Sequence, residues 1–197
     1  MDISNRISLH FDEAAETLSL SAQTLESALT QAIHALVECV SQGAKVLACG
    51  NGGSAADAQH FIAELVGRFE RERIPLAGIA LNTDTSIMTA VGNDYGYDHI
   101  FERQVQALAA PEDILVAIST SGNSPNVIKA IEAAHERDVR VIALSGKNGG
   151  QFNQILGPND IHLCVPHNRT MRIQEIHILI LHILCDGIDA FLLGDLA

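Results

Sequence analysis

The chain has 197 residues, of which 24 are acidic and 12 are basic, so its net charge at neutral pH is −12. The only cluster of Lys and Arg is the mixed-sign run 68–73, which argues against binding to a nucleic-acid backbone by charge neutralisation. Hydrophobic residues make up 47% and aromatic residues only 4%, so we expect a single domain, 1–197, with an aliphatic, Ala-rich core.

The sequence carries no targeting or membrane signal that we can identify. Its N-terminus lacks the basic stretch and apolar core of a signal peptide. The apolar run 176–185 is shorter than the ~20 residues that a membrane helix needs. The four cysteines are far apart and form no C-x-x-C pair, which is typical of buried thiols in a reducing compartment. We therefore expect a cytoplasmic protein with no membrane partner.

Residues 1–42 are predicted to form an N-terminal helical extension. Apolar residues recur at helical spacing from Ile3 to Ser41, without Pro or Gly, and they fit two different faces. We expect two helices that separate between Ser19 and Thr24, and Gly43 should end the second.

Beyond residue 43, short apolar runs alternate with helical patterns. The predicted strands are 45–49, 76–81, 114–118, 139–144 and 161–165. The predicted helices are 55–68, 85–91, 100–108, 127–137, 150–156 and 172–193. This alternation predicts an α/β fold, a three-layer sandwich in which helices cover both faces of a five-stranded parallel sheet. Ligands of such sheets bind beyond the carboxyl ends of the strands.

The segment Ser119-Thr120-Ser121-Gly122-Asn123-Ser124 is the most informative motif. It joins an apolar strand to an amphipathic helix that starts at Pro125. A helix start offers free N–H groups and the positive end of a dipole, so with four added hydroxyls it can bind a phosphate without Lys or Arg. The alternative is an ordinary Ser-capped turn, but one cap does not need four hydroxyls.

A second Gly-rich turn, Gly50-Asn51-Gly52-Gly53-Ser54, follows the first predicted strand. Its glycines let the backbone approach a ligand closely, and Asn51 and Ser54 add neutral hydrogen-bonding groups. The turn is neither the dinucleotide fingerprint G-x-G-x-x-G nor a P-loop, which has a Lys. Together the two turns predict a polar, phosphorylated ligand that is not a nucleotide.

Two pairs of polar residues on predicted helices are candidates for chemistry. His60 and Glu64 are four residues apart, so they can bind one metal ion, act as an acid–base pair, or form a plain surface pair. Gln174 and His182 lie in the apolar last helix, eight residues and roughly 12 Å apart along its axis. They can share a site only if long side chains converge.

Three further features leave more than one interpretation open. Asn93 and Asp94 follow an expected helix break at Gly92 and can bind sugar hydroxyls or cap the next helix. We interpret the Gly-rich run 146–150 as a simple loop. Four other histidines are interpreted as surface or structural residues: His34, His135, His162 and His167.

The last predicted helix is apolar around nearly its whole circumference between residues 173 and 184. A helix of this kind must be buried on all sides. Together with the long N-terminal helices, it favours a bundle at a subunit interface and hence a homo-oligomer. The alternative is a central helix that is buried within one subunit.

The motifs together resemble the sugar isomerase (SIS) family, and more narrowly its phosphoheptose isomerase branch. The resemblance runs nearly end to end and rests on the segments 50–54, 60–64, 93–94, 119–124 and 172–177. It implies a flavodoxin-like strand order and the conversion of sedoheptulose 7-phosphate to D-glycero-D-manno-heptose 7-phosphate. That ketose–aldose isomerisation passes through an enediol and supplies ADP-heptose for the lipopolysaccharide core.

The resemblance also implies roles for individual residues. The phosphate would be held by Ser119, Thr120, Ser121 and Ser124. The sugar would be contacted by Asn51, Gly52, Gly53, Asn93, Asp94 and Gln174. Glu64 and His182 would be the acid–base pair, with Glu64 as base and His182 as acid. One zinc ion per subunit would be held by His60, Glu64, Gln174 and His182. The family further implies a cytoplasmic homotetramer with active sites between subunits.

Two other functions fit the same fold. A related branch resembles this chain but binds the replication initiator DnaA and does not isomerise sugar. That branch lacks the Glu four residues after the His, whereas this chain has Glu64, which favours the enzyme. A sugar-phosphate-sensing regulatory domain would come with a DNA-binding segment, for which 197 residues leave no room.

Overall fold

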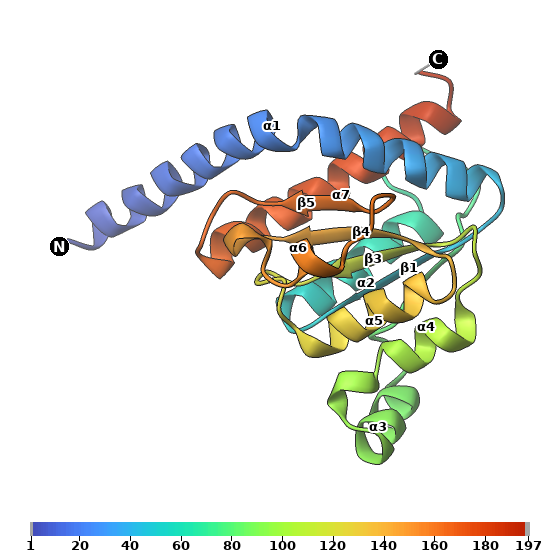
Figure 1. Cartoon of the computed structure of the whole chain (residues 1–197). Helices are drawn as coiled ribbons and strands as arrows, with labels where there is room; N and C mark the ends of the chain where they lie inside the picture. Colours follow the sequence, from blue (N-terminus) through green and yellow to red (C-terminus); the bar gives the residue numbers. More distant parts are fainter. Residues whose placement is uncertain (1, 196–197) are drawn as a thin grey trace.

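A five-stranded parallel sheet forms the centre of the structure, a computed structural model that describes residues 2–195 (Figure 1). The strands lie in the order β2-β1-β3-β4-β5. They are β1 (Val46–Gly50), β2 (Gly78–Ala80), β3 (Ile114–Ile118), β4 (Arg140–Ser145) and β5 (Ile161–Cys164). All five predicted strands are present and the order is the flavodoxin-like one, so the predicted fold class is confirmed.

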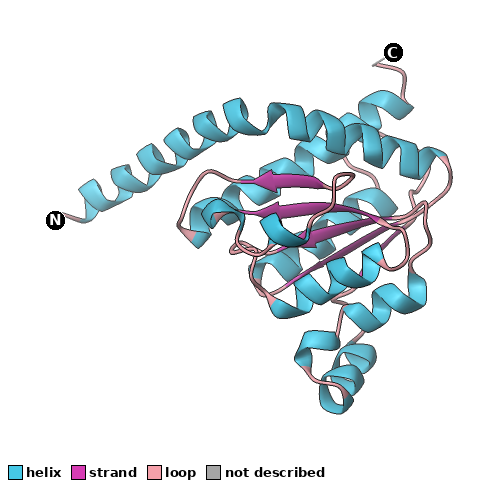
Figure 2. Ribbon diagram, in the orientation of Figure 1, coloured by secondary structure: helices cyan, strands magenta, loops and turns pink. Residues whose placement is uncertain are grey.

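Helices cover both faces of this sheet (Figure 2). The helices are α1 (Ile3–Ser41), α2 (Gly53–Val66), α3 (Thr85–Asp94), α4 (Glu102–Leu108), α5 (Pro125–His135), α6 (Phe152–Ile155) and α7 (Thr170–Leu192), with short 3-10 turns η1 (Tyr97–His99) and η2 (Lys147–Gly149). One core cluster joins the sheet to α1, α2 and α7, and a second joins it to α4, α5 and α6. The molecule therefore has three layers.

The central strands are apolar throughout because both of their faces are buried. In β1, Val46 and Ala48 contribute to the core beneath α1, α2 and α7, whereas Leu47 and Cys49 contribute to the core beneath α4 and α5. Successive side chains of a strand point to opposite faces, so a strand between two helical layers needs an unbroken apolar run. This requirement explains why these strands could be recognised in the sequence.

The N-terminal extension is one helix of 39 residues, so the prediction of two helices is wrong. No Pro or Gly interrupts residues 3–41, and the polar stretch near residue 20 stays helical. Hydroxyl side chains are accommodated there because they bond to carbonyls one turn back: Thr17 Oγ1 donates to Glu13 O at 2.7 Å and Thr24 Oγ1 to Leu20 O at 3.0 Å. The change of apolar face reflects a change of surroundings, since the first half of α1 extends beyond the sheet (Figure 1).

The expected helix break at Gly92 is also wrong. Helix α3 continues through Gly92 to Asp94, so Asn93 and Asp94 form its last turn and not a separate polar turn. A glycine in a helix weakens it but does not end it when the neighbouring residues remain helical. The second strand, by contrast, is shorter than predicted, because only Gly78, Ile79 and Ala80 pair with β1 at this edge of the sheet.

Helix α7 is buried mainly within its own chain. It packs on α1 and α2, and its buried residues include Ile173, Ile180, Leu184 and Ile188. The interpretation of a central helix buried within one subunit thus accounts for most of its apolar surface. A narrower strip that includes Leu179 and Ile183 stays exposed.

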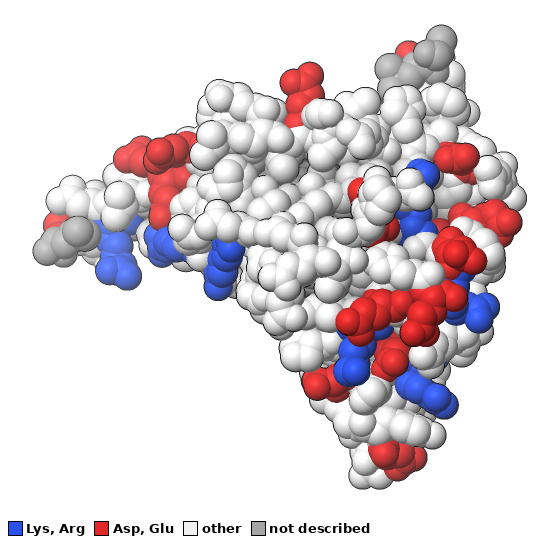
Figure 3. Space-filling model, viewed as in Figure 1, with Lys and Arg blue, Asp and Glu red and all other residues white. Residues whose placement is uncertain are grey.

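The acidic composition is visible on the surface. Acidic side chains gather on the face shown in Figure 3, and Lys and Arg are scattered among them without a continuous basic patch. The four cysteines are free thiols, three of them buried. Across residues 2–195, no helix combines the length and apolar character that crossing a bilayer requires.

Candidate active site

The two Gly-rich turns meet at one point because of the strand order. Strands β1 and β3 are neighbours, and their carboxyl ends lie at the same edge of the sheet. The chain leaves β1 into α2 on one face and leaves β3 into α5 on the other. A crevice forms where successive crossovers diverge in this way, and it is the usual ligand position in such folds.

The turn after β3 holds its hydroxyls in a compact arrangement. Ser119 is 3% exposed, and its Oγ lies 2.9 Å from Ser124 Oγ. Ser121 Oγ accepts a hydrogen bond from Asn123 N at 3.2 Å. Ser124 precedes α5 but makes no side-chain cap to that helix. The Ser-cap alternative is therefore not what the structure contains, and the hydroxyl remains in the turn, next to the helix start.

The segment after β4, which was predicted to be a simple loop, is hydrogen-bonded to this turn. Gly146 N donates to Thr120 O at 3.2 Å, and Gln151 N donates to Asn123 Oδ1 at 2.9 Å. Gly122 has φ of +64°, and a Cβ there would lie 2.0 Å from Gly149 O. The hydroxyl turn therefore packs against residues 146–150, which help to fix its position.

The turn after β1 is hydrogen-bonded to the start of α5. Asn51 Nδ2 donates to Asn126 Oδ1 at 2.7 Å, and Asn126 Nδ2 donates to Asn51 Oδ1 at 2.8 Å. Tyr97 Oη donates to the same Asn51 oxygen at 3.2 Å. The neighbouring Gly53 leaves room for Gln174, because a Cβ on Gly53 would lie 2.5 Å from Gln174 Nε2.

His60, Glu64 and His182 come together although 122 residues separate the two histidines. His60 Nε2 lies 3.0 Å from His182 Nε2 and 3.4 Å from Glu64 Oε1. The ring of Phe69 lies beside that of His182, with 5.7 Å between their centroids. The i, i+4 pair predicted on α2 therefore faces the predicted histidine of α7.

The Gln174 carboxamide lies at the start of α2 and not beside these three residues. It adjoins Gly53 at the start of α2, seven residues or roughly 10 Å along that helix from His60. His182 and Gln174 thus meet different parts of α2, His182 at His60 and Gln174 at Gly53. Within residues 2–195, no three His, Cys, Asp or Glu side chains are arranged as a ready metal cluster.

Asn93 and Asp94 are exposed and lie in the segment of α3 that projects from the sheet (Figure 1). Asn93 Nδ2 donates to Asp94 Oδ1 at 2.7 Å. In the described part of the chain, neither side chain has a hydrogen bond to the two turns. The structure therefore does not bring this predicted pair together with the other candidates.

Burial keeps one histidine of α7 neutral. His177 is fully buried, and its Nε2 donates to Ser145 O at 3.0 Å. Desolvation lowers its pKa to about 4, although the bond to Ser145 opposes the shift. His177 is thus a structural residue that fixes α7 against the end of β4. His135 and His162 are structural too, since they bond to Asp160 and Ser145.

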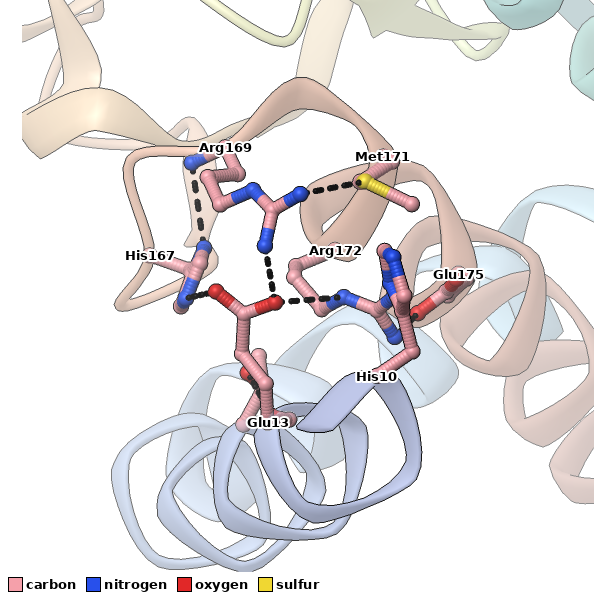
Figure 4. Close-up of polar contacts among 8 residues, drawn as sticks. His10, Glu13, His167, Arg169, Met171, Arg172 and Glu175 are labelled. Carbon is pink, nitrogen blue, oxygen red and sulfur yellow. Dashed lines mark hydrogen bonds and ion pairs between the residues drawn. The ribbon is translucent and has the colours of Figure 1, made fainter. Parts of the chain in front are cut away.

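An ion-pair cluster anchors the start of α7 to α1 (Figure 4). The buried guanidinium of Arg172 contacts Glu175 Oε2 at 2.5 Å, His10 Nδ1 at 2.9 Å and Glu13 Oε2 at 3.3 Å. Arg169 also binds Glu13, and its hydrogen bond lowers the pKa of that carboxyl. The cluster fixes the turn of α7 that carries Gln174.

One cavity of the described residues lies away from these groups. It has a volume of about 540 Å³ and is lined by residues that precede β3 and β4, at the opposite edge of the sheet. Its principal charges are paired within the protein, as Lys45 with Asp113 and His135 with Asp160. A larger cavity, of about 620 Å³, is lined by residues of α2 and β2 that include His60. The convergence of functional groups therefore identifies the candidate site.

Comparisons with known proteins show which family this chain resembles. The model of the SIS domain family matches residues 10–146. The chain is 65% identical to phosphoheptose isomerase of Bordetella avium over 99% of both chains, and 56% identical to that of Azoarcus sp. over 98% of both. Two solved structures are also similar. Phosphoheptose isomerase GmhA from Neisseria gonorrhoeae has a TM-score of 0.91 at 51% identity, covering 96% of this chain and 100% of that one. Phosphoheptose isomerase from Francisella tularensis has 0.93 at 45%, covering 96% and 99%.

These relatives are named as an enzyme, and the matches cover nearly their whole length. They give no support to the DnaA-binding alternative. The matched family model contains both Gly-rich turns, and the relatives extend the match through α7. The chain therefore belongs to the SIS domain family and, within it, to the phosphoheptose isomerases.

Proposed function

We propose that the protein isomerises sedoheptulose 7-phosphate to D-glycero-D-manno-heptose 7-phosphate. The observation that carries this proposal is the meeting of two uncharged, Gly-rich turns at a helix start, with Glu64 and His182 on the adjoining helices α2 and α7. The names of the relatives support the same reaction. A neutral phosphate site also suits a ligand that must be released after each turnover.

The residues divide into three groups in this proposal. The phosphate contacts Ser119, Thr120, Ser121 and Ser124. The sugar contacts Asn51, Gly52, Gly53, Asn93, Asp94 and Gln174. The acid–base pair is Glu64 and His182. Asn93 and Asp94 lie on the helix that projects from the sheet, so they would contact the sugar from α3.

The chemistry requires two proton transfers to form the enediol and two more to form the aldose. Glu64 removes a proton from C1 of the ketose while His182 donates one to the carbonyl oxygen at C2, which gives the enediol. The hydroxyl at C1 then loses its proton and C2 gains one, so the aldose forms with no net change in protons. Anchoring the distant phosphate holds C1 and C2 beside these two groups.

We further propose that His60, Glu64, Gln174 and His182 hold one zinc ion. His60, Glu64 and His182 fit the metal, because imidazole nitrogens and carboxylate oxygens are ordinary zinc ligands, whereas Gln174 would have to turn from Gly53 toward them. His60 Nε2 faces both His182 Nε2 and Glu64 Oε1, and a single N–H cannot satisfy both contacts. When bound, zinc would supply Lewis acidity toward a substrate oxygen. A zinc-bound carboxylate would be a weaker base, so Glu64 would not serve as ligand and base at once, and His182 could donate a proton only from the ring nitrogen that does not bind the metal.

One assay tests both the reaction and the metal. We expect protein loaded with zinc to convert sedoheptulose 7-phosphate to the aldose, and protein dialysed against a chelator to lose most of that turnover until zinc is added back. A zinc-loaded protein that leaves the ketose unchanged would contradict the proposed function. Full turnover after verified removal of the metal would contradict the proposed role of zinc but not the proposed reaction.

We also propose that the protein is a cytoplasmic homotetramer with active sites between subunits. The projecting half of α1 exposes apolar residues at helical spacing: Ile3, Ile7, Phe11 and Leu18. A stripe of this kind is typical of a helix that packs against another copy. The four free cysteines suit a reducing compartment.

Light scattering checks the assembly directly. One chain has a mass of 21.1 kDa, so the tetramer should have four times that mass. Replacing Ile7 and Phe11 with Glu should shift the mass downward, because two charges would interrupt the apolar stripe. Exchanging the exposed acidic Asp12 for Asn, on the same stretch of helix, is the control and should leave the mass unchanged. A monomeric wild-type protein would refute the assembly.

A further inference from the structure

Asn126 is a buried polar residue to which the proposed reaction assigns no role. It is the second residue of α5, it is 1% exposed, and it directly follows Pro125. A carboxamide that is removed from water needs partners for both its oxygen and its N–H groups. Asn126 finds them on one side chain, that of Asn51, 75 residues earlier in the chain.

The pair leaves Asn51 with a single hydrogen-bonding group for a ligand. Its oxygen accepts from Asn126 Nδ2 at 2.8 Å and from Tyr97 Oη at 3.2 Å, so both lone pairs are used. One N–H of its Nδ2 donates to Asn126 Oδ1 at 2.7 Å. The second N–H of Nδ2 is the one group that these contacts do not use.

We infer that Asn126 is a positioning residue, which orients the Asn51 carboxamide so that its remaining N–H faces a ligand oxygen. The inference rests on the proposed function, because it assigns that oxygen to the sugar phosphate. The same pair fixes the separation of the two Gly-rich turns, since Asn51 lies in the first turn and Asn126 begins the helix after the second. The donor would select a hydroxyl, carbonyl or phosphate oxygen.

A double-mutant cycle on Asn51 and Asn126 tests this role through KM. We expect Asn126→Ala to raise KM for sedoheptulose 7-phosphate about tenfold, because a lost partner leaves a misoriented polar group, while kcat changes less than about twofold. Asn51→Ala should have a similar effect. The double variant should be no worse than Asn51→Ala, because Asn126 acts through Asn51.

Gln104→Ala is the matched control. Gln104 is also a buried carboxamide, 5% exposed, but it bonds to the backbone oxygens of Leu81 and Ile100. Its loss should lower the melting temperature without raising KM. If Asn126→Ala does not fold, Asn126→Ser serves in the same cycle, because its short hydroxyl cannot make both bonds to Asn51.

A crystal structure of the Asn126 variant separates this inference from the proposed reaction. We expect the Asn51 carboxamide to turn away from its wild-type orientation, whether or not the protein isomerises this sugar. An unchanged Asn51 orientation, an unchanged KM, or a double variant whose KM is the product of two independent effects would each overturn the inference. Absence of turnover in the wild type, with Asn51 turned in the variant, would overturn the reaction alone.

Discussion

Glu64→Gln should lower kcat for sedoheptulose 7-phosphate by about 10²-fold or more, because the amide cannot accept the proton that leaves C1. The substitution keeps the shape of the side chain, and Arg73 binds the backbone oxygen of Glu64 at 2.8 Å, a contact that does not depend on the carboxylate. The fold should therefore be retained. Coupled detection of the aldose product at saturating ketose is the measurement.

Glu102→Gln is the matched control for this experiment. Glu102 also forms a pair with a histidine three residues earlier, His99, but it lies on α4, on the other face of the sheet from α2. Its loss removes one negative charge from a comparable pair and should leave kcat nearly unchanged. Equal turnover by Glu64→Gln and wild type would remove Glu64 from the mechanism, and an equal loss in both variants would indicate a general effect of charge.

Gly122→Ala should lower kcat/KM on the order of 10²-fold, mainly through KM, because the hydroxyl turn would be displaced from the phosphate. The backbone at Gly122 has φ of +64°, and the added methyl group would lie 2.0 Å from the carbonyl oxygen of Gly149. The clash would involve the backbone of the turn and the backbone of the supporting loop, so one of these two segments would have to move to relieve it. Steady-state kinetics with sedoheptulose 7-phosphate would show the change.

Gly43→Ala separates the backbone penalty from the displacement. Gly43 has φ of +75°, and a Cβ there would meet nothing within 4 Å. The strain of a left-handed Ala, roughly 1–2 kcal/mol, is therefore common to both variants, but only Gly122→Ala moves the turn. Gly43→Ala should be destabilised with an unchanged KM. A Gly122→Ala protein that is folded and has the wild-type KM would contradict the proposed phosphate site.

Local patterns in the sequence were sufficient for the fold class. The unbroken apolar runs of β1 and β3 reflect burial on both faces, and the Gly and Pro residues at 43 and 125 mark helix boundaries. The same reasoning failed at residues 19–24 and at Gly92, where hydroxyls and a glycine suggested breaks that the helices do not make. Such residues lower helix propensity only slightly, so their neighbours decided the outcome.

The candidate site could be predicted in its parts but not in its assembly. The sequence by itself determined that two uncharged turns follow strands and that His60 and Glu64 share a helix face, because these are properties of local chain geometry. No local pattern showed that His182 joins them, which only the family resemblance implied, and only the tertiary structure decided that Gln174 lies by Gly53 and that Asn126 binds Asn51. Those contacts join residues far apart in the chain, so they depend on strand order and helix packing, which no short-range pattern records.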